Sequence, residues 1–221
     1  AWDGPDADFT PRSDDLPWCM VPEKKITVED VKYVLSSHYQ GTPYDPYASY
    51  GDKTMCGAYR SIGINRNDVM TLIQMRPDVP ANCQAVQWLA FASNAFNTLV
   101  PFYAAVDETP EYLANTTKEV STGNFYWSAR MIAAMADASF AKSAIHIERY
   151  QNAVQAKGHA LLRKYDAEAA KITDPAESRR LLEKANREIA KMLKEETGNT
   201  LDHVLFELSN SMKNAFSRSD A

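Results

Sequence analysis

The hydrophobic pattern of the chain changes at Asn124, and this change restricts the fold more than any other feature. Before it, short runs rich in Ile, Val, Met and Tyr alternate with turn residues, as in strands. After it, apolar residues recur three and four positions apart, as in helices that bury one face. We therefore predict an α+β protein. Residues 1–123 would hold an irregular segment, one helix and antiparallel strands, and residues 124–221 would hold helices that pack on the sheet.

Four strands are predicted in the first region. Residues 55–64 and 68–76 are rich in Ile, Val, Met and Tyr, and the sequence NRND between them predicts the turn of a hairpin. Residues 84–92 form a nearly continuous apolar run, which is typical of a strand covered on both faces. A shorter strand is predicted near 98–103. Strands joined by hairpins imply an antiparallel sheet.

One helix is predicted before the strands, with Thr27 as its N-cap and its end near His38. The aromatic sequence YQGTPYDPYASYGD follows it as a long loop. Loops of such length in compact domains are more often functional than idle.

Long helices are predicted in the second region. The first runs from Asn124 towards Tyr165. Another begins at Asp174 and Pro175, since aspartate is a good N-cap and proline suits the first helical position. Gly198 is predicted to end this helix, and a last amphipathic helix follows. The apolar stripes of these helices would also serve self-association, so a homo-oligomer is one expectation.

Charge and composition argue against several classes of protein. The net charge of −5 argues against nucleic acid as a partner, because binding nucleic acid needs a concentrated basic face. No apolar run approaches the roughly 20 residues of a membrane-spanning helix. Three scattered cysteines fit a reducing compartment better than a secreted fold built on disulfides, so a cytoplasmic protein is expected.

Familiar motifs for metal or nucleophilic chemistry do not occur in the sequence. The four histidines are scattered, and HExxH, GxSxG and a glycine-rich phosphate loop are all missing. Cys19, Cys56 and Cys83 have no histidine near them in sequence, and a packed, unreactive thiol is the simpler interpretation of each. We therefore expect no metal, no cofactor and no catalytic residue in this chain.

Polar and aromatic residues near the predicted strands are the candidates for substrate binding. Arg60 either points outward at a sheet edge or faces a cleft, where its guanidinium would suit a substrate carboxylate. Asn94 and Asn97 either form turns or donate to a substrate carbonyl. Trp88 belongs to a set of aromatic residues that either fill the core or line a pocket. The complete candidate set is Tyr59, Arg60, Ser61, Trp88, Asn94 and Asn97.

Four segments of the chain, taken in order, resemble one family. They are YQGTPYDPY, MCGAYRSIGINRNDVMTLIQMR, VQWLAFASNAFNTLVPFYAAVDETPEYL and FYWSARMIAAMAD. Over roughly residues 25–150 they are similar to the C-terminal half of the dipeptidases of peptidase family C69.

The resemblance implies the fold of an N-terminal nucleophile (Ntn) hydrolase, in which two stacked antiparallel sheets lie between helical layers. It also implies a cysteine nucleophile at the first residue of the mature enzyme, with the α-amino group of that cysteine as its base. This chain begins with Ala1, whose methyl group cannot attack a carbonyl. We therefore expect the C-terminal part of a dipeptidase, inactive alone, that forms one fold unit with a missing N-terminal half.

Three functions stay open on the sequence alone. The first is a broad-specificity dipeptidase that acts on small peptides. The second is a related Ntn amidohydrolase that cleaves N-acyl amides. The third is a non-catalytic interaction module, in which the helical tail from 141 to 221 docks a partner and the sheet is a scaffold.

Overall fold

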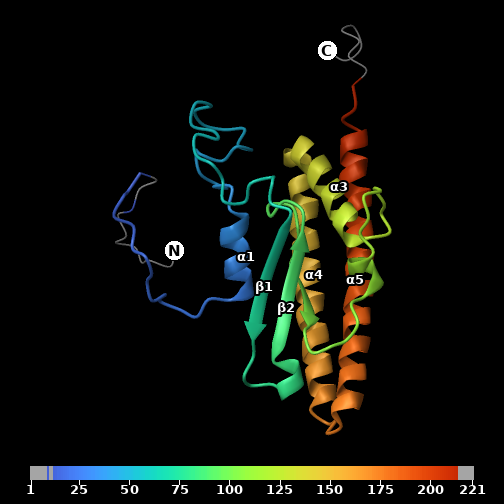
Figure 1. Ribbon diagram of the computed structural model, residues 1–221. Coiled ribbons are helices and arrows are strands. Elements are labelled where there is room, and N and C mark those ends of the chain that lie inside the picture. Colours follow the sequence, from blue (N-terminus) through green and yellow to red (C-terminus); the bar gives the residue numbers. More distant parts are fainter. Residues whose placement is uncertain (1–8, 10–11, 214–221) are drawn as a thin grey trace.

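The structure is a computed structural model that describes residue 9 and residues 12–213. It is an α+β fold with a three-stranded antiparallel sheet and long helices packed against it (Figure 1), which confirms the predicted class. Part of the predicted irregular segment, residues 1–8, 10 and 11, lies outside the described residues, as do residues 214–221 of the predicted helical region.

The sheet consists of β1 (Val69–Met75), β2 (Ala85–Phe91) and β3 (Val100–Tyr103). The strands lie in the order β1-β2-β3, and both neighbouring pairs are antiparallel. Leu72 lies opposite Trp88 in the first pair. The three later predicted strands are thereby confirmed to within two residues at each end.

The strand predicted at 55–64 is wrong, because this segment folds as consecutive turns. Gly57 has a φ of +66°, which belongs to a turn rather than a strand. Gly63 donates its N–H to the carbonyl of Ser37 at 2.8 Å. A Cβ at Gly63 would lie 2.5 Å from the carbonyl oxygen of Ser36, so only glycine permits this close approach. The segment therefore docks on the end of the first helix and forms no hairpin with β1.

Five α-helices accompany the sheet in the described part of the chain. They are α1 (Val28–Ser36), α2 (Glu111–Ala114), α3 (Phe125–Ala138), α4 (Phe140–Ala169) and α5 (Pro175–Ser209). Thr27 caps α1 in a capping box with Asp30, and Asp174 caps α5 ahead of Pro175, as predicted. No helix among the described residues is both long and apolar enough to cross a membrane.

Two predicted helix boundaries are wrong. The helix that begins after Asn124 does not reach Tyr165, because it breaks at Ser139, whose φ of −137° is not helical. Gly198 lies inside α5, which runs for 35 residues. Buried residues continue along the same face of α5 as far as Val204, so packing holds the helix together across the glycine.

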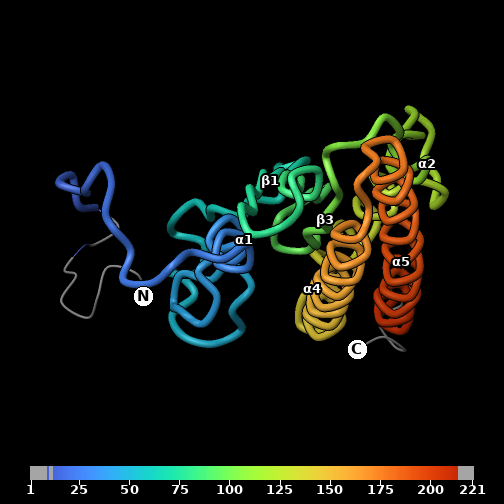
Figure 2. Tube along the Cα trace, turned by 90° about the horizontal axis from the view of Figure 1, so that it is seen from below, coloured from blue at the N-terminus to red at the C-terminus, as the bar shows by residue number. Residues whose placement is uncertain are grey.

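The helices α4 and α5 form an antiparallel hairpin beside the sheet, while α1 lies next to β1 at the other end (Figure 2). Arg76, just after β1, joins the sheet to α4. Its Nη1 and Nη2 atoms lie 2.7 and 2.9 Å from the two carboxylate oxygens of Asp166. The hydroxyl of Tyr103 donates to the same carboxylate at 2.9 Å. This contact fixes the sheet on the helical hairpin.

The outer edge of β3 is closed by a proline and by one side-chain amide. Pro101 has no N–H to offer. Asn186 of α5 accepts the N–H of Tyr103 with Oδ1 at 2.9 Å and donates from Nδ2 to the carbonyl of Tyr103 at 3.0 Å. The amide therefore takes the place of a neighbouring strand.

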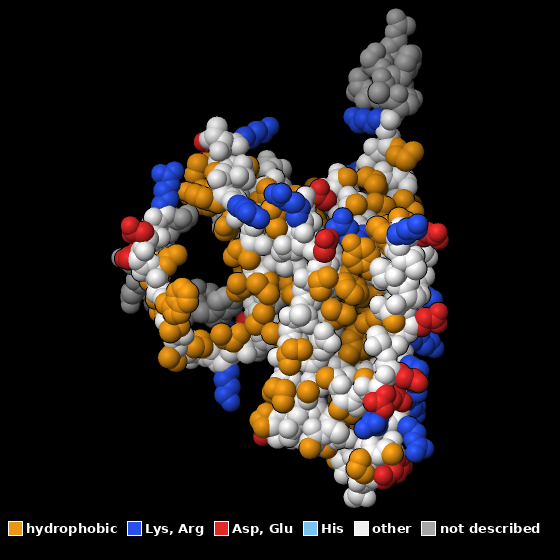
Figure 3. Space-filling model, viewed as in Figure 1, with side chains coloured by type: hydrophobic (Ala, Val, Ile, Leu, Met, Phe, Trp, Pro, Cys, Tyr) orange, Lys and Arg blue, Asp and Glu red, His pale blue; other side chains and the backbone are white. Residues whose placement is uncertain are grey.

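One face of β1 is apolar and exposed. Val69, Ile73 and Met75 are 54%, 60% and 65% exposed. Figure 3 shows hydrophobic side chains gathered over this part of the surface. Among the described residues β1 pairs with β2 alone, so its outer edge has no strand partner. A free edge beside an exposed apolar face is typical of a surface that another element covers.

Candidate functional site

A strained turn follows β2. Ala92 has a φ of +69°, a left-handed conformation that residues other than glycine rarely adopt. Its N–H donates to the carbonyl of Asp68 at 2.8 Å, and its own carbonyl accepts from Nδ2 of Asn97 at 2.8 Å. Strain of this kind costs about 1–3 kcal/mol and is concentrated at functional sites. The turn at 92–98 is therefore a candidate site.

A buried lysine on α1 forms hydrogen bonds to this turn. Lys32 of α1 is only 5% exposed. Its ammonium lies 2.8 Å from Oδ1 of Asn97, 2.5 Å from the carbonyl of Asn94 and 2.6 Å from Oγ of Ser36. Burial lowers the pKa of Lys32 to about 7. The three acceptors match the three donors of a charged ammonium group, so this cluster ties α1 to the turn.

The two asparagines that were predicted to bind substrate both form hydrogen bonds within the protein. Asn94 donates from Nδ2 to the carbonyl of Leu35 at 3.1 Å. Asn97 donates to Oδ1 of Asn94 at 3.2 Å as well as to Ala92. Both asparagines are buried. In this structure they shape the turn, which is one of the two interpretations of the sequence.

The turn forms one wall of an open pocket of about 490 Å³, a volume within the range of small-molecule sites. Helix α3 forms the opposite wall. Oγ of Ser93 is buried and has no hydrogen-bond partner among the described residues, which is uncommon for a buried hydroxyl. The lining comprises Asn65, Ser93, Phe96, Val120, Trp127, Arg130, Met131, Ala133, Ala134 and Asp137.

Two residues of opposite charge line this pocket from α3. Nη1 of Arg130 lies 2.5 Å from a carboxylate oxygen of Asp68, at the start of β1. Oδ1 of Asp137 accepts from the hydroxyl of Tyr47 at 2.5 Å. Burial, and next the hydrogen bond to Asp137, raise the pKa of Tyr47, so this hydroxyl keeps its proton. Each charged group therefore lines the pocket and has one hydrogen-bond contact within the described residues.

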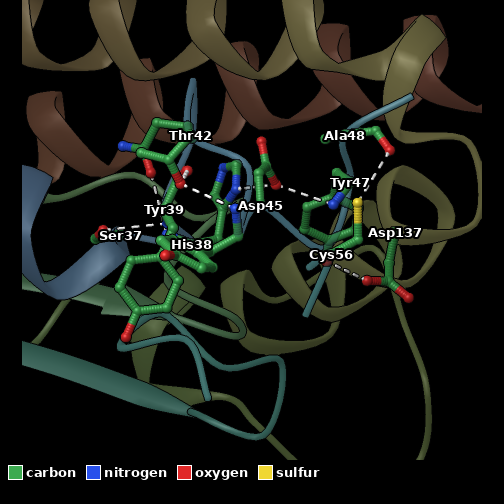
Figure 4. Close-up of polar contacts among 11 residues, drawn as sticks. Ser37, His38, Tyr39, Thr42, Asp45, Tyr47, Ala48, Cys56 and Asp137 are labelled. Carbon is green, nitrogen blue, oxygen red and sulfur yellow. Dashed lines mark hydrogen bonds and ion pairs between the residues drawn. The ribbon is translucent and has the colours of Figure 1, made fainter. Parts of the chain in front are cut away.

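The aromatic loop after α1 positions Tyr47 (Figure 4). Asp45 is buried and accepts both from the Tyr47 N–H at 2.9 Å and from Nδ1 of His38 at 3.0 Å. The Tyr47 ring stacks on Phe140 with 4.1 Å between centroids. Cys56 lies nearby, with its Sγ 3.9 Å from the carbonyl of Ala48. The loop therefore contacts the pocket residue Asp137 through Tyr47, and its function stays a prediction.

The other predicted site residues lie away from this pocket. Trp88 is fully buried, donates from Nε1 to Gln74 at 2.9 Å and packs on His159, so it belongs to the core. Tyr59, Arg60 and Ser61 lie in the turns at 55–64, where Arg60 is exposed and the Tyr59 ring packs on Tyr44. The structure thus brings together Asn94 and Asn97 but not the rest of the set.

Four residues of the site were missed from the sequence: Lys32, Ser93, Arg130 and Asp137. Lys32 follows Val28 by four positions and therefore lies on the apolar stripe of α1, which was a usable signal. Arg130 and Asp137 are seven positions apart on α3 and so share a face. Ser93 gave no signal, because its burial depends on the turn after β2.

The buried cysteine of the described residues is Cys83. Burial, and next the Asp166 carboxylate, raise the pKa of its thiol to about 11. Because the thiolate is the reactive form, Cys83 is unsuited to nucleophilic attack. No group of three or more potential metal ligands converges in the part of the chain that the structure describes.

Comparisons with known proteins give one consistent result. The sequence model of peptidase family C69 matches residues 2–153. The "Dipeptidase" of Bifidobacterium longum (strain NCC 2705) is 44% identical over 256 aligned residues, which cover 99% of this chain and 48% of that protein. The "Probable dipeptidase A" of Streptococcus pyogenes serotype M3 (strain SSI-1) is 45% identical over 95% of this chain and 44% of its own length. The chain spans about half the length of these curated relatives.

Proposed function

The chain belongs to peptidase family C69, as its sequence predicted, and from this membership we propose that it is part of an enzyme that hydrolyses dipeptides. The observation that carries the proposal is the alignment with relatives named as dipeptidases over 99% and 95% of the chain. The pocket between the 92–98 turn and α3 supports it, because it combines an aromatic wall with a few charged and polar groups.

In this proposal the chain supplies part of the substrate site. Asn94 and Asn97 keep the 92–98 turn in its strained shape, and the turn presents Ser93 and Phe96 to the pocket. Tyr59, Arg60 and Ser61 remain predicted contacts to a substrate, since Arg60 is exposed and available to a carboxylate.

The nucleophile is proposed to be an N-terminal cysteine outside these residues. Its free α-amino group would take the thiol proton, because an α-amine titrates at about pH 8. The thiolate would attack the peptide carbonyl, the amine product would leave, and water would release the acyl group from the enzyme.

The remainder of the polypeptide is proposed to cover the exposed face of β1. Val69, Ile73 and Met75 are each more than half exposed, and the edge of β1 has no strand partner in the described part of the chain. A second sheet packed there, as in Ntn hydrolases, would bury these side chains at about 25 cal/mol per Å² of apolar surface.

Two assays on the full-length protein test the function. The first measures the release of free amino acids from dipeptides and the cleavage of N-acyl amides. Hydrolysis of dipeptides alone is expected, whereas cleavage of N-acyl amides alone would identify an amidohydrolase instead. The second determines the mature N-terminus and replaces the first residue, if it is cysteine, by alanine. Activity that survives this replacement would exclude the proposed nucleophile.

The third function considered from sequence, a helical docking module, has less support. It depended on apolar stripes free to meet a partner. Leu182, Ile189 and Leu193 of α5 are fully buried in the core of this chain. The stripe of α5 is therefore used to hold the sheet and α4.

A further inference from the structure

The pocket beside α3 has opposite charges at the two ends of one helical face. Arg130 and Asp137 both line it and are seven residues apart. Seven residues are two turns of helix, about 10.5 Å along the axis. We propose that this pocket binds an unblocked dipeptide by both of its ends, with Arg130 on the α-carboxylate and Asp137 on the α-ammonium. The inference rests on the proposed function, because it takes the dipeptide from there.

The positions of Arg130 and Asp137 on α3 are separated by a length that a short peptide can span. Two extended residues span at most about 7 Å. A hydrogen bond of about 2.9 Å at each end then reaches the side chains on α3. The pocket volume of about 490 Å³ leaves room for two side chains.

Arg130 has donors to spare for a carboxylate. A guanidinium carries five N–H donors, and in the described residues only Nη1 of Arg130 is engaged, on Asp68. The side chain is 40% exposed, so a ligand reaches it from solvent. A free edge of the guanidinium can grip a carboxylate through two parallel hydrogen bonds.

Asp137 has the matching capacity for an ammonium group. Its Oδ1 is occupied by the Tyr47 hydroxyl, and its Oδ2 has no partner among the described residues. Tyr47 is held by Asp45 and by the stack on Phe140, so it fixes the orientation of the carboxylate. The ammonium of a substrate would lie against the remaining oxygen.

Ser93 lies on the wall that the 92–98 turn contributes to the pocket. Its Oγ is buried, 3% of the residue is exposed, and it has no partner within the described chain. Because this hydroxyl lies beneath the pocket surface, Arg130 and Asp137 are the two polar contacts assigned to the ligand. The strained φ of Ala92, next to Ser93, sets the position of the hydroxyl.

The test uses the full-length enzyme and three forms of one substrate: alanyl-leucine, its N-acetyl derivative and its C-terminal amide. In the unaltered enzyme we expect each blocked form to have a kcat/KM about tenfold to a hundredfold below that of the free dipeptide, the loss typical of one charged hydrogen bond. An enzyme that cleaves all three forms equally would overturn the inference without any variant. An enzyme that cleaves none of them would instead overturn the proposed function.

Two variants test which side chain binds which end of the dipeptide. Arg130→Gln should lower kcat/KM for the free dipeptide about tenfold to a hundredfold, mainly through KM, and leave the C-terminal amide unaffected. Asp137→Asn should do the same for the free dipeptide and leave the N-acetyl derivative unaffected. A loss that is equal for free and blocked substrates would show a merely structural role and contradict the assignment.

Matched controls separate binding from folding. Asp68→Asn removes the ion pair of Arg130 but keeps its charge in the pocket, so the preference for a free carboxylate should persist. Arg163→Gln and Asp202→Asn make the same chemical changes at exposed sites on α4 and α5 and should change no substrate preference. If Asp68→Asn abolishes the carboxylate preference as fully as Arg130→Gln does, Arg130 acts only through that ion pair.

Discussion

At the scale of single residues, the amine of Lys32 combines two opposing effects. Three acceptors hold the charged form, and burial disfavours it. The pKa of the native amine, about 7, lies below the ordinary value of 10.5. Between these two values the unfolded chain binds more protons than the native one, so stability from this residue rises with pH.

We predict that the full-length protein gains stability relative to Lys32→Met between pH 7 and about pH 10. The slope should approach about 1.4 kcal/mol per pH unit at most. Below pH 7 the difference should be constant, because both states are then protonated. Urea denaturation of both proteins across this range measures the difference. Parallel stability curves above pH 7 would mean that Lys32 titrates normally and is not buried as the structure has it.

Gly63 is a position at which no larger side chain fits without a backbone shift. A Cβ there would meet the backbone of Ser36, which cannot rotate away as a side chain would. We expect Gly63→Ala to destabilise the protein by about 1–3 kcal/mol, the usual cost of overpacking. Thermal unfolding measures this. A melting temperature equal to that of the unaltered protein would show that the 55–64 turns do not pack on the end of α1.

At the scale of secondary-structure elements, the sequence predicts some boundaries well and others not at all. Thr27 and Asp174 mark helix starts because a cap acts through its own neighbours, two or three residues away. The strand at 55–64 was predicted from its composition and from the NRND sequence after it, and neither shows that Gly57 and Gly63 are needed for turns. A sequence therefore predicts the features that depend on neighbouring residues, such as helix caps.

The interior glycine of α5 gives a prediction of the opposite sign to Gly63. A Cβ at Gly198 would meet no atom within 4 Å, and the residue is helical. Glycine in a helix interior is less favourable than alanine by about 0.5–1 kcal/mol. Gly198→Ala should therefore raise the free energy of unfolding by that amount, as measured by urea denaturation. Destabilisation instead would place the end of the helix at Gly198, as the sequence alone predicted.

The candidate pocket could not be predicted from the sequence, because its lining depends on contacts between distant segments. Its lining comes from loops around Asn65 and Val120, from the turn after β2 and from α3, which only the folded chain brings together. The pairing of Asn94 with Asn97 was predictable, because they are three residues apart in one turn. Their shared partner Lys32 lies 65 residues from Asn97 and was not.

At the scale of the whole molecule, the exposed apolar face of β1 is the surface that we propose the rest of the polypeptide covers. We predict that Ile73→Asp lowers the stability of the full-length protein by about 2 kcal/mol or more, because a charge would be buried under the covering layer. Dipeptide hydrolysis should fall with it. Phe206→Asp is the control, since Phe206 is 65% exposed on α5, close to the 60% of Ile73, and lies away from the sheet.

Thermal unfolding and dipeptide turnover of the two variants decide the question. Equal and small effects of Ile73→Asp and Phe206→Asp would mean that the face of β1 stays in contact with water in the complete enzyme. A selective loss for Ile73→Asp would locate the junction between this chain and the rest of the polypeptide on the sheet.

The occupied outer edge of β3 determines at which edge of the sheet a further strand can pair. An incoming strand would find no free donor at Pro101 or Tyr103, because one has no N–H and the other is taken by Asn186. A further strand can therefore join the sheet only beside β1. In any larger assembly that extends this sheet, β3 is the terminal strand, and a single amide on α5 is what makes it so.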